Sequence, residues 1–65
     1  MKTTNFIRYL NQNNCRLLRE GGNHSIFQNE LNRKISSVPR HKESKNNLVR
    51  KICKDLEITP PENFQ

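Results

Sequence analysis

No more than two apolar residues are adjacent anywhere in this sequence of 65 residues. A membrane-spanning helix needs about 20 mostly apolar residues in a row, and a secretory signal peptide needs an apolar segment of about 7 to 15. The sequence contains neither, and we expect a cytoplasmic protein. Because 31% of the residues are hydrophobic, a core can form only from helices and strands that each bury one face. Length restricts the chain to one small domain and excludes large multidomain enzymes.

The charge balance indicates a polyanionic partner. Twelve Lys and Arg residues against six Asp and Glu give a net charge of +6, which favours nucleic acid, an anionic membrane or an acidic protein. A membrane-surface helix would combine basic residues with a continuous apolar face, and no segment does so. Tryptophan is absent and aromatic residues make up 6% of the chain, so contact with phosphates is favoured over stacking on bases.

The two cysteines, Cys15 and Cys53, are far apart in the sequence and form no CxxC or zinc-binding pattern. We expect both to be small apolar core residues with free thiols. A disulfide or a reactive thiol is the alternative. The sequence predicts no metal site and no cofactor.

The apolar pattern predicts two helices and three strands. The expected order is a helix over 3–13, strands over 15–20, 24–28 and 33–38, and a helix that begins between Ser44 and Asn46. This α-β-β-β-α order predicts an α+β fold, a two-layer sandwich in which two amphipathic helices cover a three-stranded meander. We expect one domain over 1–58 and a flexible tail over 59–65.

Local signals set the ends of these elements. Thr3 or Thr4 is expected to cap the first helix, and Asn13-Asn14 to end it. The strand over 24–28 should place its even-numbered residues on one face. A core of thirteen large apolar residues is expected, with small net stability and a monomer when free: Phe6, Ile7, Leu10, Leu17, Leu18, Ile26, Phe27, Ile35, Val38, Leu48, Val49, Ile52 and Leu56.

The segment Gly21-Gly22-Asn23-His24-Ser25-Ile26-Phe27 is the most distinctive part of the sequence. A double glycine between two short runs predicts a hairpin, and Gly22 would let a phosphate approach the backbone closely. His24 would then stand at the mouth of a strand. Histidine is the side chain best suited to proton transfer near neutral pH. The alternative is an ordinary polar histidine on an edge strand.

A second segment, Val38-Pro39-Arg40-His41-Lys42, brings cations to the entrance of the second helix, with Lys45 one turn further on. Arg40, Lys42 and Lys45 together predict a phosphate clamp aided by the helix N-terminus. The alternative is a solvated basic loop.

With these segments, nearly the whole chain resembles the HicA-type toxins of bacterial toxin–antitoxin systems. The resemblance is carried by Phe6-Ile7, the Gly-Gly-Asn-His-Ser-Ile-Phe segment, Val38-Pro39-Arg40-His41 and the segment from Leu48 to Leu56. It implies a fold like the double-stranded-RNA-binding domain and a ribonuclease that cleaves mRNA without a metal. It also implies silencing by a HicB-type antitoxin in a hetero-oligomer, and it places the family's catalytic histidine at His24.

Three positions depart from the family pattern. Many members have Ser where this chain has Asn23, and a second His where it has Ser25. Glycine often follows the last helix in the family, whereas Glu57 stands here. We expect local hydrogen bonding around His24, and the end of the last helix, to differ accordingly.

The chemistry expected of such a ribonuclease is simple, because RNA carries its own nucleophile, the 2′-hydroxyl. His24 would transfer the proton, and the RNA-binding and charge-stabilising residues would be Gly22, Arg19, Arg40, His41, Lys42 and Lys45. The sequence leaves open whether His24 acts as acid or base and whether His41 complements it. Two other functions remain open, a non-catalytic RNA-binding module that reads A-form shape and an adaptor for an acidic protein.

Overall fold

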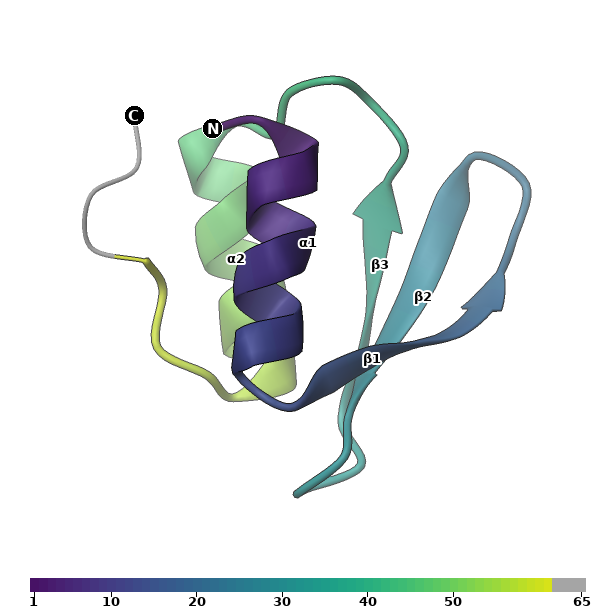
Figure 1. Ribbon diagram of the computed structural model, residues 1–65, viewed down its shortest axis with the longest axis vertical. Helices are drawn as coiled ribbons and strands as arrows, with labels where there is room; N and C mark the ends of the chain where they lie inside the picture. Colours follow the sequence, from purple (N-terminus) through teal and green to yellow (C-terminus); the bar gives the residue numbers. More distant parts are fainter. Residues whose placement is uncertain (62–65) are drawn as a thin grey trace.

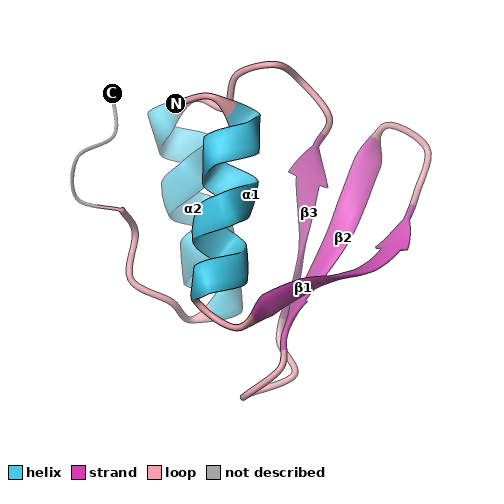
Figure 2. Cartoon of the chain, viewed as in Figure 1, coloured by secondary structure: helices cyan, strands magenta, loops and turns pink. Residues whose placement is uncertain are grey.

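The computed structural model describes residues 1–61, which form five elements in the predicted order. These are α1 (Thr3–Gln12), β1 (Cys15–Glu20), β2 (His24–Asn29), β3 (Ile35–Pro39) and α2 (Asn46–Leu56). The strands form an antiparallel sheet in the order β1-β2-β3. Figure 1 shows the two helices side by side on one face of this sheet, and Figure 2 shows the resulting separation of a helical layer from a strand layer. The predicted α-β-β-β-α sandwich is confirmed.

The third strand begins later than predicted because the chain first closes a tight turn. Arg33 takes a left-handed φ of 67°, and its backbone N–H donates to the carbonyl of Asn29 across 2.8 Å. The ladder with β2 can start only after this turn, at Ile35 opposite Gln28. The expected strand over 33–38 is therefore shifted to Ile35–Pro39.

The core lies between the helices and the sheet face beneath them. Its side chains are at most 4% exposed and come from every element: Phe6, Leu10, Cys15, Phe27, Val38, Val49, Ile52, Cys53 and Leu56. Both cysteines are buried and free, as expected. Burial raises the pKa of the Cys15 thiol, and it raises that of Cys53 to about 11.

Three residues predicted for the core are exposed instead. Leu17 and Leu18 are 49% and 50% exposed, and Ile35 is 52% exposed. The pairing of β1 with β2 shifts register after Leu17, a β-bulge, and this end of β1 extends away from the helices (Figure 1). Ile35 begins the edge strand β3 and lines an open hollow with Leu48 and Lys51 of α2. The sequence pattern alone could not show which part of the sheet the helices cover.

The prediction that Thr3 or Thr4 caps α1 is wrong. The N-cap is Lys2, and no side chain bonds to the first turn of the helix. The Thr3 hydroxyl instead contacts the Ser44 hydroxyl at 2.9 Å, and the Thr3 backbone N–H donates to the carbonyl of Lys42. At the other end of α1, Asn14 takes the left-handed conformation expected there, with a φ of 67°.

The end of α2 is fixed by side chains from the β2–β3 turn. The amide groups of Asn29 and Asn32 both donate to the carbonyl of Leu56, at 2.9 and 3.1 Å. Glu57 then takes a left-handed φ of 58°, a conformation that glycine adopts without steric cost. The departure from glycine at this position therefore leaves the helix end intact. Residues 62–65 of the expected tail lie outside the described residues.

Candidate functional site

His24 is the first residue of β2, and its side chain lies on the open face of the sheet. Ser25, Phe27 and Asn29 are buried beneath the helices, while His24 is exposed. Side chains alternate along a strand, so the even-numbered residues of β2 share the open face, as predicted. Within residues 1–61, no hydrogen bond or ion pair engages the exposed His24 imidazole.

The hairpin before His24 is closed by the Gly21 backbone N–H, which donates to the His24 carbonyl across 2.8 Å. Neither glycine has a positive φ. A Cβ added at Gly22 would have no heavy atom of another residue within 4 Å, apart from its chain neighbours. The predicted hairpin is confirmed, but its conformation does not require glycine. The open space at Gly22 leaves its backbone accessible to a ligand.

Arg40 reaches across from the end of β3 to this hairpin. Its Nη1 donates to Oε1 of Glu20 at 3.1 Å, and its Nη2 donates to the Gly21 carbonyl at 2.9 Å. The backbone N–H of Arg40 also donates to the Asn23 carbonyl, at 3.2 Å. The Arg40 guanidinium is therefore held against the turn that precedes His24.

Glu20 has a second partner at the same oxygen. The Ser25 hydroxyl donates to Oε1 of Glu20 at 2.6 Å, and Ser25 is 5% exposed. Sequence reasoning missed both residues. The hairpin register places Glu20 opposite Ser25, but no local pattern links either to Arg40, which follows β3.

Arg19 lies on the open face near His24. It is the cross-strand partner of Ile26, and Ile26 shares a face with His24 two positions away along β2. Such diagonal neighbours lie about 7–8 Å apart and are within reach of a long side chain. Arg19 also lines a hollow of about 370 Å³ with Ile35 and with Lys51 of α2.

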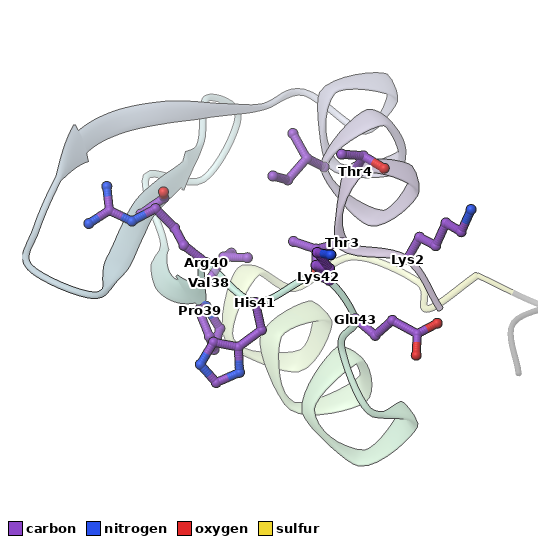
Figure 3. Close-up of a pocket in the computed structure, with 11 residues that line it drawn as sticks. Lys2, Thr3, Thr4, Val38, Pro39, Arg40, His41, Lys42 and Glu43 are labelled. Atoms are coloured by element: carbon purple, nitrogen blue, oxygen red, sulfur yellow. The ribbon is translucent and has the colours of Figure 1, made fainter.

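Three of the other predicted binding residues gather at one cavity, and the fourth lies apart. Arg40, His41 and Lys42 line a cavity of about 670 Å³ between the start of α1 and the end of β3. In Figure 3, Arg40 extends toward the strands, while His41 turns away beside Pro39. Lys45 lines a separate hollow of about 320 Å³ with Met1 and Ser44. Arg40 and Lys42 therefore share one cavity, and Lys45 lies apart from them.

The described residues contain no group of three His, Cys, Asp or Glu side chains arranged to hold a metal ion. They also contain no helix long and apolar enough to cross a membrane. The raised pKa values of Cys15 and Cys53, together with their burial, keep both thiols protonated at neutral pH. The two exposed histidines, His24 and His41, are therefore the candidates for proton transfer in the described part of the chain.

The fold and its site define a small basic protein with the α-β-β-β-α architecture of the double-stranded-RNA-binding domain and an exposed histidine at the mouth of a hairpin. Residues 4–58 match the family described as the HicA toxin of bacterial toxin–antitoxin systems. The chain belongs to this family, and as the toxin of such a system it has an antitoxin as partner. Searches of curated proteins and of solved structures gave no match.

Proposed function

We propose that this toxin is a metal-independent endoribonuclease that cleaves mRNA in the cytoplasm and that a HicB-type antitoxin silences it. The observation that carries the proposal is the His24 imidazole, exposed on the open sheet face with Arg19 diagonally across from it. No hydrogen bond or ion pair within the described residues engages this imidazole, so it is accessible to a substrate.

The chain's residues suit a reaction in which RNA supplies the nucleophile. His24 would transfer a proton to or from the 2′-hydroxyl or the leaving oxygen, a contribution of about 10²–10⁴-fold. Arg19 would offset the charge that develops on the phosphate. Gly22, with open space where a Cβ would stand, would allow the RNA backbone to approach the turn. His41, Lys42 and Lys45 would hold flanking phosphates.

The test is incubation of the purified protein with a long single-stranded RNA in excess EDTA, followed by analysis of the fragment ends. We expect cleavage that leaves a 2′,3′-cyclic phosphate or a 3′-phosphate, the product of attack by the 2′-hydroxyl. Cleavage lost in EDTA and restored by a divalent cation would overturn the metal-independent mechanism.

One observation favours a second candidate, a non-catalytic RNA-binding module. His41 lines the cavity beside α1, whereas His24 lies on the opposite, open face of the sheet, so the two histidines are not arranged as an acid–base pair. Salt-sensitive binding of RNA without any cleavage would support this second function.

A further inference from the structure

We infer that Arg40 and Glu20 are positioning residues that hold the turn before His24, rather than residues that bind RNA phosphate. This inference rests on the proposed role of His24. It also changes the interpretation of Arg40, which the sequence alone assigns to a phosphate clamp.

The contacts of Arg40 enclose the turn from both ends. Its guanidinium bonds to Glu20 and to the Gly21 carbonyl, where the chain leaves β1. Its backbone N–H bonds to the Asn23 carbonyl, immediately before His24. The planar fork of arginine can make two such bonds at once, and lysine cannot reproduce this geometry.

Glu20 extends the same network to the residue after His24. Its Oε1 accepts the Ser25 hydroxyl at 2.6 Å and the Arg40 Nη1 at 3.1 Å. Because Ser25 is buried, its hydroxyl needs this partner. The residues on both sides of His24 are thus connected to one network, which we call the hairpin clamp: Glu20, Gly21, Asn23, Ser25 and Arg40.

The turn has little else to hold it. Residues 21–24 are all exposed. Neither glycine has a positive φ, so the turn is not held in a conformation that only glycine adopts. Beyond the clamp, the Gly21–His24 backbone bond closes the turn. A displacement of about 1 Å at a reacting group can cost about 100-fold in rate, so the clamp is in the right place to control the position of His24.

The two possible roles of Arg40, phosphate contact and positioning of the turn, predict different effects when Glu20 is removed. If Arg40 bound RNA, Glu20 would compete with the phosphate, and its removal would tighten RNA binding. If the two residues position the turn together, removal of either one slows cleavage. The sign of the Glu20 effect therefore separates the two roles.

The experiment measures kcat, KM and the salt dependence of RNA binding for Arg40→Ala, Glu20→Ala and the double variant. We expect each single variant to lower kcat by about 10–100-fold, with KM and the salt slope unchanged. The double variant should be no slower than the slower single one, because both substitutions break one network. Glu20→Gln should restore most of the rate, since its side-chain carbonyl can accept both hydrogen bonds, and Arg40→Lys should restore little.

Glu30→Ala is the matched control, because Glu30 is also an exposed carboxylate beside an arginine, 4.0 Å from Arg16 Nε, away from the turn. Its kcat should equal that of the parent. A salt slope that falls by about one in Arg40→Ala with kcat unchanged, or tighter RNA binding in Glu20→Ala, would overturn the inference.

Hydrogen exchange gives a readout that does not need catalysis. The Gly21 amide donates to the His24 carbonyl, so it should exchange faster in Arg40→Ala and Glu20→Ala than in the parent and in Glu30→Ala. A parent protein that cleaves no RNA would overturn the proposed function and, with it, the catalytic purpose of the clamp. Unchanged exchange at Gly21 would overturn the clamp itself, whatever the activity.

Discussion

The hydroxyl groups of Thr3 and Ser44 meet at 2.9 Å inside the protein, although 41 positions separate the two residues. Both side chains are buried, at 7% and 2% exposure. Beside this contact, Lys2 and Glu43 form an antiparallel β-bridge. The Ser44 backbone N–H also donates to the Met1 carbonyl. The start of α1 is thereby joined to the segment that leads into α2.

This contact predicts a measurable coupling. Ser44→Ala leaves the Thr3 hydroxyl buried without its partner and should lower the free energy of unfolding by about 1–3 kcal/mol. The double variant Thr3→Val, Ser44→Ala should lose less than the sum of the two single variants. Urea unfolding measures this, with the exposed Thr4→Val as control; strict additivity would show that the two hydroxyls do not depend on each other.

The left-handed Glu57 predicts a stabilising substitution. Glu57→Gly should raise the free energy of unfolding by about 1 kcal/mol, because a residue with a Cβ pays a steric cost of this size at such a φ. The change also removes the exposed pair of Glu57 with Lys34, at 3.8 Å, which contributes less than about 1 kcal/mol. Glu57→Ala removes the same pair but keeps the Cβ, so it should be no more stable than the parent.

The buried thiols predict a loss of stability at high pH. Burial, with a smaller contribution from Cys15, raises the pKa of Cys53 from 9.0 to about 11 in the folded protein. The unfolded chain therefore releases this proton at lower pH than the folded one, and stability falls as pH rises from 9 toward 11. Urea unfolding across this range measures the fall, which should be smaller in Cys53→Ala. Iodoacetamide at pH 8 should label neither cysteine until the protein unfolds.

His24→Ala should abolish RNA cleavage and toxicity, since loss of a positioned proton-transfer group costs about 10²–10⁴-fold. His24 is exposed and outside the core, so the variant should keep the parent's circular dichroism and its binding to the antitoxin. The readouts are the cleavage rate and growth after expression. A folded variant that cuts RNA at the parent rate would remove His24 from the mechanism.

Lys42 and Lys45 should act independently in RNA binding, because they line different hollows. Each change to Ala should weaken binding at low salt and reduce the salt slope by about one phosphate contact. The double variant should show the sum of the two effects. Titration of labelled RNA at several salt concentrations measures both quantities; an unchanged slope in the double variant would place the RNA elsewhere.

The sequence by itself determined the order of the elements and the faces of β2. Helix and strand periodicities are local, so Ile52 and Leu56 could be assigned to the buried side of α2, and His24 to the open side of β2, without knowledge of the fold. The Asn14 turn and the glycine hairpin were predictable for the same reason, since the conformational preferences of a residue act over a few neighbours.

Tertiary structure alone decided which side chains meet across the chain. Hydrogen bonds join segments that are far apart in the sequence: Arg40 donates to Glu20 and to the Gly21 carbonyl, and Asn29 donates to the Leu56 carbonyl. The position of the helices on the sheet likewise decided that Leu17 is half exposed while Phe27, its cross-strand partner, is buried. Such pairings depend on sheet register, twist and helix placement, which arise when all five elements pack together and which no short stretch of sequence encodes.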